Sequence, residues 1–188
     1  EDLLKFVDVF GSKVNFAYNP IFQWSIWTSG TVSYGDTETT GTKLGSKTKV
    51  KDLSIGFDKQ ISEDYLLGFG IHESRGENTV QFERSNVYSD SLSVSSYHNI
   101  ALDNNEYIDL ILTYGDIEID GNRYASGTST NHTFYRTGHY YNTSLGFNKI
   151  LTTNNLSFNP YGRFSFGQIE LAAYDESPGV EALHVAAQ

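Results

Sequence analysis

The sequence predicts an all-β protein: an antiparallel transmembrane β-barrel, or a partial barrel of about seven to eight strands, with a short N-terminal helix as one alternative for its first residues. Two observations favour this fold. Segments in which apolar and polar residues alternate follow one another along most of the chain, and this period of two is the signature of β-strands. The chain also combines 14% aromatic residues and 17 Gly with only 3 Pro, a composition typical of long antiparallel strands. A soluble β-sandwich shares most of this composition, so the individual segments must distinguish the two.

The chain opens with a different pattern, EDLLKFVDVF. Several of its apolar residues have helical spacing, Asp2 is a suitable N-cap, and Gly11 could end a helix there. An ordinary first strand explains the same residues about as well. We interpret residues 1–19 as a linker or helical lead-in and residues 20–188 as one incomplete β-barrel domain. The residues with helical spacing are Leu3, Phe6, Val7, Phe10 and Val14.

The most informative segment is a hairpin at residues 52–74, with a polar turn at residues 62–64. On both arms one face is apolar, and the other carries small polar residues such as Gly68, Gly70 and Ser74. The apolar face would be core in a soluble protein, and it would face lipid in an outer-membrane barrel. Small polar residues favour a lumen, because a solvated strand more often carries Lys, Glu or Thr. We therefore expect these residues to face lipid: Leu53, Ile55, Phe57, Leu67, Phe69 and Ile71.

A later strand, YIDLILTYGDIEID, changes character along one face. Leu110 and Leu112 lie on its apolar face, and we expect both to face lipid. Beyond Tyr114 the same face carries Asp116, Glu118 and Asp120. A soluble core strand could also end in this way. A strand that leaves a bilayer is expected to carry charged residues at this point, because carboxylates tolerate water and not acyl chains.

Connections of two lengths alternate along the chain. Short polar turns are expected near residues 62–64, 103–106 and 152–155, and longer connections near 35–49, 76–86 and 121–133. Short turns at one end and long loops at the other are typical of outer-membrane barrels. Sandwiches and lipocalins can also alternate in this way, so the layout is a modest argument.

The composition excludes several classes of function. The chain has no Cys, which removes disulfides and thiolate chemistry, and no segment approaches the length of apolar sequence that a membrane helix needs. A net charge of -10 with 13 basic residues argues against nucleic acid as a partner. The five His have no ligand spacing, and no motif singles out a nucleophilic Ser. We therefore predict no catalytic, metal or cofactor site, and because the chain lacks Met we expect an N-terminal region to have been removed.

Three charged residues share the parity of the small polar side chains in their strands. They are Asp58, Arg136 and Arg163. In a barrel they would point into the lumen, where charges can pair across the interior or contact a threaded segment. In a soluble protein they would be solvated strand residues.

The order of motifs resembles the C-terminal translocator barrel of autotransporters, the type V secretion proteins of Gram-negative outer membranes. The resemblance covers roughly residues 20–188. The motifs are Trp24 and Trp27, Gly56-Phe57-Asp58, Leu67-Gly68-Phe69-Gly70, Tyr107-Ile108-Asp109, Ser144-Leu145-Gly146-Phe147, Pro160-Tyr161-Gly162-Arg163 and Tyr174-Asp175-Glu176.

The resemblance implies a non-enzymatic barrel in the Gram-negative cell outer membrane that anchors and exports an N-terminal passenger. Its partners would be outer-membrane lipid, the passenger domain of the same polypeptide and the barrel assembly machinery. The family barrel has more strands, so the chain is expected to be a piece of a longer barrel or to have its edges covered by a partner. Two alternatives stay open: a soluble β-barrel or β-sandwich that binds a ligand or glycan, and an outer-membrane barrel lipid hydrolase.

Overall fold

The computed structural model describes nine stretches of the chain and places thirteen strands in them. The described stretches are residues 7–9, 14–19, 24–39, 44–80, 85–102, 105–124, 130–153, 156–177 and 182–188. Within them there is no α-helix, and no described helix is long and apolar enough to cross a membrane.

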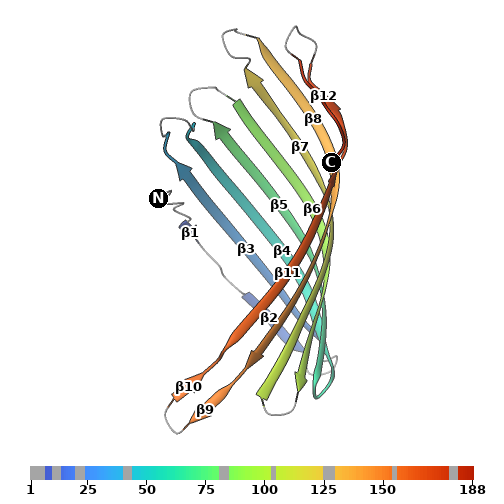
Figure 1. Ribbon diagram of the computed structural model, residues 1–188. Helices are drawn as coiled ribbons and strands as arrows, with labels where there is room; N and C mark the ends of the chain where they lie inside the picture. Colours follow the sequence, from blue (N-terminus) through green and yellow to red (C-terminus); the bar gives the residue numbers. More distant parts are fainter. Residues whose placement is uncertain are drawn as a thin grey trace.

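Seven long strands follow one another in chain order across one sheet, each antiparallel to its neighbours (Figure 1). Polar and apolar residues alternate over the central part of these strands, which favours strand formation there. This count confirms the expected seven to eight strands. The strands are β3 (Trp24–Thr37), β4 (Ser46–Ser62), β5 (Tyr65–Val80), β6 (Ser85–Leu102), β7 (Glu106–Tyr124), β8 (Asn131–Lys149) and β11 (Tyr161–Leu171).

Shorter strands complete the fold at the edges. β1 (Val7–Val9) and β2 (Val14–Asn19) both pair antiparallel with β3. β9 (Leu151–Thr153) and β10 (Leu156–Phe158) form a small hairpin before β11, and β12 (Tyr174–Asp175) pairs with β13 (His184–Val185) after it.

The two alternatives for the N-terminal region are resolved in part. Val7–Val9 and Val14–Asn19 are strands, so the described residues match a first strand and not a helix. Pairing with β3 satisfies their backbone groups, which outweighs a weak helical spacing of apolar side chains. Residues 1–6 and 10–13, where the rest of the expected helix falls, lie outside the described residues.

The long connections expected from the sequence are largely strand. β3 continues to Thr37 and β4 begins at Ser46; the next two connections run from Val80 to Ser85 and from Tyr124 to Asn131. These strand ends carry polar residues on both faces, so they show no alternation of apolar and polar residues in the sequence. The short turn at Glu63 and Asp64 is confirmed, whereas residues 103–104 and 154–155 lie outside the described residues.

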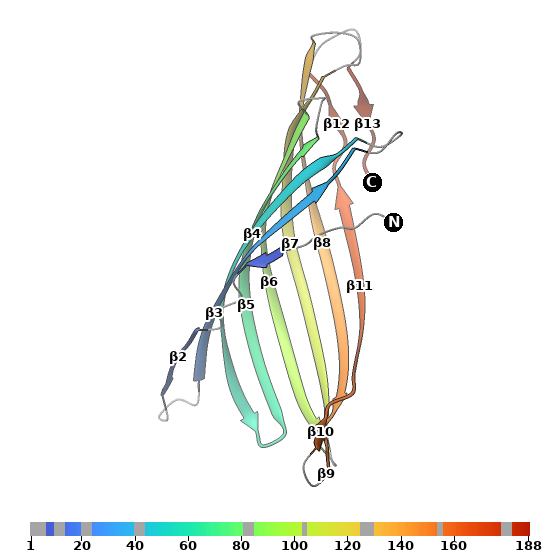
Figure 2. The same cartoon turned by 90° about the vertical axis from the view of Figure 1, so that its left-hand side faces the viewer.

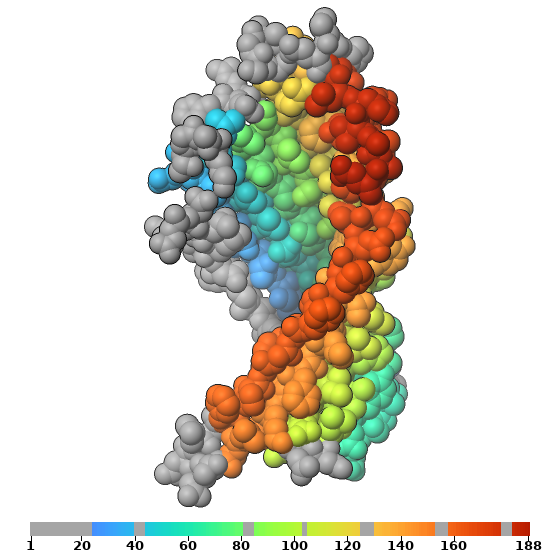
Figure 3. Space-filling model, in the orientation of Figure 1, coloured from blue at the N-terminus to red at the C-terminus, as the bar shows by residue number. Residues whose placement is uncertain are grey.

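The sheet is strongly curved, and its strands cross it obliquely (Figures 1 and 2). In Figure 3 the atoms of β4–β6 lie recessed behind those of β11, so one face is hollow. We call this the concave face. Asp58 and Tyr97 lie on it and line a pocket, whereas the exposed Phe57 and Phe69 lie on the opposite, convex face. The sheet does not close within the described residues, so the fold is a partial barrel.

Candidate functional site: the two faces of the curved sheet

The three charged residues expected in a lumen all lie on the concave face. Asp58 shares a row across the sheet with Tyr97, Ser144 and Ser165. Arg136 and Arg163 lie an even number of residues from Ser144 and Ser165 on their strands and therefore point to the same side. That this side is a lumen stays a prediction.

A chain of hydrogen bonds crosses the concave face from β3 through β6 to β4. The indole Nε1 of Trp27 donates to the Tyr97 hydroxyl over 2.6 Å. The Tyr97 hydroxyl donates to the Asp58 carboxylate over 2.7 Å. Both aromatic side chains thereby satisfy their polar atoms, and Asp58 gains a charge-assisted bond.

Glycines on β4 and β5 make room for these two rings. A Cβ atom on Gly56 would overlap the indole of Trp27, and one on Gly68 would overlap the ring of Tyr97. The large side chains therefore lie flat along the sheet and do not project into the hollow. This explains why a face with a Trp and a Tyr needs glycine in the adjacent strands.

A histidine lies next to this chain and is held from both sides. The Nδ1 atom of His72 is 2.8 Å from the Ser54 hydroxyl, and its Nε2 atom is 2.6 Å from the Ser95 hydroxyl. A pocket on the concave face is lined by this group together with Trp27, Ser29, Asp58, Ser93, Tyr97, Ile111 and Thr113.

The two arginines differ in their surroundings. Arg163 is exposed, with its guanidinium carbon 5.6 Å from the centre of the Tyr161 ring. The guanidinium carbon of Arg136 lies 5.2 Å from the ring centre of Tyr174. Within the part of the chain that the structure describes, the buried Nε and Nη2 atoms of Arg136 have no hydrogen-bond partner.

A buried ion pair fixes β12 and β13 against the end of the sheet. Arg123 Nη2 donates to Glu176 over 2.6 Å and its Nε donates over 3.0 Å, while the Leu183 backbone N–H donates to the same carboxylate over 3.0 Å. The Glu176 side chain is only 2% exposed. The hydrogen bond from Arg123 is the main cause that lowers the pKa of Glu176, and burial acts in the opposite direction.

The convex face carries a continuous belt of exposed apolar side chains. Leu53, Ile55, Phe69 and Ile71 are 57%, 56%, 43% and 52% exposed. In a protein surrounded by water, a contiguous apolar surface of this kind needs a partner to cover it. Leu67 and Leu110 are half-buried on this face. All eight residues expected to face lipid lie on it, namely Leu53, Ile55, Phe57, Leu67, Phe69, Ile71, Leu110 and Leu112.

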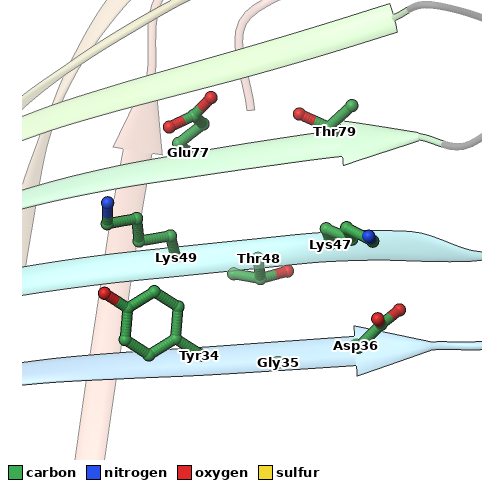
Figure 4. Close-up of a pocket in the computed structure, with 8 residues that line it drawn as sticks. All are labelled: Tyr34, Gly35, Asp36, Lys47, Thr48, Lys49, Glu77 and Thr79. Carbon is green, nitrogen blue, oxygen red and sulfur yellow. The ribbon is translucent and has the colours of Figure 1, made fainter.

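The belt ends in charged side chains toward the connections that follow β3, β5 and β7. Glu73 and Asp116 share the first charged row with His139, whose Nδ1 is 2.6 Å from Asp116. Further along the same face, two more rows cross β3, β4 and β5 (Figure 4). The first row contains Tyr34, Lys49 and Glu77, and the next contains Asp36, Lys47 and Thr79. That these rows mark the exit of the strands from an apolar phase stays a prediction.

The sequence alone did not indicate two groups of contacts. The first group is Trp27, Tyr97 and His72, and the second is the ion pair of Arg123 and Glu176. The residues of the first group are brought together only by the register of four strands, and the ion pair joins residues 53 apart. One signal was present: Gly56, Gly68 and Gly70 all fall on the face that also carries the large rings. Among the described residues no group of His, Asp and Glu could hold a metal ion.

Comparison with known proteins identifies the family. The family model for the autotransporter β-domain matches residues 26–188. A solved structure that resembles this chain is the translocator domain of the autotransporter NalP from Neisseria meningitidis, with a TM-score of 0.75 and 13% identity. The match covers 88% of this chain and 56% of that one, so the chain spans little more than half of the NalP domain. A search of curated proteins found no match.

These findings confirm the predicted class, an outer-membrane β-barrel of Gram-negative bacteria in the type V secretion group. They also confirm the all-β partial-barrel fold. Because the family match extends over most of the sequence, the chain belongs to the autotransporter β-domain family.

Proposed function

We propose that this chain forms the lipid-embedded wall of a translocator that anchors a passenger of the same polypeptide in the outer membrane and exports it. The observation that carries the proposal is the contrast between the two faces. The convex face exposes apolar side chains such as Leu53 and Ile71, and the concave face carries His72, Asp58 and a row of serines. A barrel wall between lipid and a hydrated passage needs this arrangement.

The eight belt residues from Leu53 to Leu112 would contact acyl chains, and Asp58, Arg136 and Arg163 would line the passage. Arg136 supports this assignment, because its guanidinium has buried nitrogen atoms without hydrogen-bond partners among the described residues. A segment that passes along the concave face could supply an acceptor if the side chain moves away from the Tyr174 ring. Insertion would require the barrel assembly machinery, since an unpaired sheet edge is costly in lipid.

A soluble sandwich is not favoured. In the described residues no second sheet packs on Leu53, Phe69 or Ile71, which are exposed. A hydrolase is not favoured either, although His72 contacts Ser95. Its other nitrogen faces the Ser54 hydroxyl and not the carboxylate that orients the histidine of a catalytic triad. Domains of this family generally lack enzymatic activity, and we propose the same for this chain.

Export can be tested on the complete polypeptide that contains this chain, expressed in a Gram-negative host with an epitope tag placed before residue 1. We expect antibody to bind the tag on intact cells. A variant with Ile71→Lys in the convex belt should lose the surface signal, because a lysine there would have to enter lipid. The matched variant Tyr88→Lys changes the same face beyond the belt and should keep it. A tag that stays inside cells, or a chain that fractionates without membrane, would contradict the proposal.

A further inference from the structure

We infer that the convex face holds a binding site for one anionic glycerophospholipid, with Lys59 and Trp24 at its phosphate and an apolar groove for an acyl chain. The inference rests on the proposed function, because it requires the convex face to lie in a bilayer. It goes further in assigning a defined site, a lipid class and one leaflet to that surface.

Lys59 is the cationic part of the site. It shares a row across the convex face with Trp24 and Leu67, and its Nζ lies 5.3 Å from the centre of the Trp24 ring. A cation held over an indole at the edge of an apolar belt is a typical interfacial anchor. In the stretches that the structure describes, no carboxylate lies within ion-pair distance of Lys59.

Two other basic residues of the convex face are paired with carboxylates, whereas Lys47, Lys49 and Lys51 lie toward the opposite end of the strands, away from Trp24 and the groove beside it. Lys149 lies at the same end of the sheet, and its Nζ is 2.7 Å from Glu106. Arg75 lies beyond the opposite end of the belt, 2.6 Å from Glu73. Their charges are balanced within the protein, whereas the charge of Lys59 is available to an external anion such as a phosphate.

An apolar groove begins beside Lys59. The rings of Trp24 and Phe57 are 5.5 Å apart, and those of Phe57 and Phe69 are 5.7 Å apart, so three aromatic side chains form one continuous wall. Its surface is almost entirely apolar, which suits an acyl chain and not a peptide with backbone groups to satisfy. Besides Trp24 the groove is lined by Ile26, Ile55, Phe57, Phe69, Ile71 and Val94.

The position of Lys59 selects the leaflet. It lies close to the turn at Glu63 and Asp64, the shorter type of connection, and outer-membrane barrels have their short turns on the periplasmic side. Lys51, on the same strand and face, lies about 27 Å away along the strand at about 3.4 Å per residue. With a strand tilt of about 40° this is about 20 Å across the membrane, close to the height of a barrel's apolar band. The site therefore faces the inner leaflet, which consists of glycerophospholipids.

The chain offers a direct reporter of this site. It has two tryptophans, and Trp27 lies on the concave face. In the complete polypeptide, with Trp27→Phe and with any tryptophan outside residues 1–188 replaced by Phe, Trp24 becomes the only tryptophan. Bromine atoms on lipid acyl chains quench tryptophan on contact. The measurement is competitive quenching in vesicles of phosphatidylcholine, with brominated phosphatidylglycerol or brominated phosphatidylcholine as the added lipid. Trp24→Phe, which retains Trp27, is the control for the concave face.

We expect phosphatidylglycerol to bind next to Trp24 about five times more strongly than phosphatidylcholine, the factor that corresponds to about 1 kcal/mol for one basic residue at a membrane surface. Lys59→Gln should reduce this preference to about one. Lys51→Gln removes a lysine from the same strand and face at the other end of the belt and should leave the preference unchanged. Inorganic phosphate should not compete, because it lacks an acyl chain.

Each other outcome has a defined meaning. Equal quenching by both lipids, or a preference that survives Lys59→Gln, would overturn the lipid site and leave the membrane-spanning function intact. A loss of preference in both lysine variants would show general surface attraction in place of a site. If no brominated lipid quenches Trp24 but water-soluble iodide does, the proposed function itself is wrong.

Discussion

Replacing Gly68 by Ala tests the concave-face packing most severely. The new methyl group would overlap the ring of Tyr97, which cannot move without loss of its bonds to Trp27 and Asp58. Gly68 is paired on both sides, with Asp58 on β4 and Tyr97 on β6, so the backbone has little freedom to move away. We expect the ring to be displaced and both hydrogen bonds to be weakened or lost.

The magnitude follows from these contacts. Overpacking costs about 1–3 kcal/mol, and a hydrogen bond to a charged group contributes about 1.5–3 kcal/mol. Alanine offsets about 0.5–1 kcal/mol of this because glycine is the less favourable strand residue. The Gly68→Ala variant should therefore unfold with a free energy lower by about 1.5–5.5 kcal/mol.

Urea unfolding in lipid vesicles, followed by tryptophan fluorescence, measures the change. Gly162→Ala is the matched control, since a Cβ there would have nothing within 4 Å. In a Tyr97→Ala background, the Gly68→Ala change should cost less than about 0.5 kcal/mol, because its clash partner is absent. The reasoning is refuted if Gly68→Ala is neutral in the wild type, or equally costly in both backgrounds.

Two further predictions concern the belt and the buried ion pair. Phe69→Lys should destabilise the folded state in lipid by about 2–4 kcal/mol, and Tyr88→Lys by at most about 1 kcal/mol. Reversible folding into vesicles measures both changes. Equal costs for the two variants would contradict the position of the belt. Because the folded-state pKa of Glu176 is lowered, its contribution is complete above the ordinary carboxylate pKa and is lost as the pH falls through the lowered value. Glu176→Gln should therefore speed hydrogen exchange at the Leu183 amide at neutral pH, where the ion pair with Arg123 contributes about 1.5–3 kcal/mol; unchanged exchange would show that the pair does not hold β12 and β13.

The sequence predicted the faces of the sheet better than its dimensions. The side chains of Leu53, Phe57 and Phe69 lie on one face because the period of a strand is fixed at two residues, and apolar alternation reveals it. The pattern of apolar residues did not reveal the last residues of β5 or the first residues of β6. Asn78, Thr79 and their neighbours are polar on both faces of the strand. Backbone pairing holds such residues in the sheet, and no side-chain pattern reports it.

The concave-face contacts depend on register, which a single sequence does not contain. Trp27 and Tyr97 meet because Gly56 and Gly68 lie between them in two intervening strands. The three charged residues were placed on this face from parity alone. Their partners, such as Tyr97 for Asp58 and Tyr174 for Arg136, required the folded sheet.

The central claim, that one face of this sheet meets lipid and the other a polar interior, can be tested directly along β5. The chain has no Cys, so single cysteines can carry a nitroxide label at positions 69, 71, 72 and 74 of the complete polypeptide in vesicles. Electron paramagnetic resonance then compares collisions with oxygen, which concentrates in lipid, and with a polar nickel chelate. The account predicts that labels at 69 and 71 collide mainly with oxygen, whereas those at 72 and 74 do not. Equal accessibility at all four positions, or the reverse alternation, would contradict it.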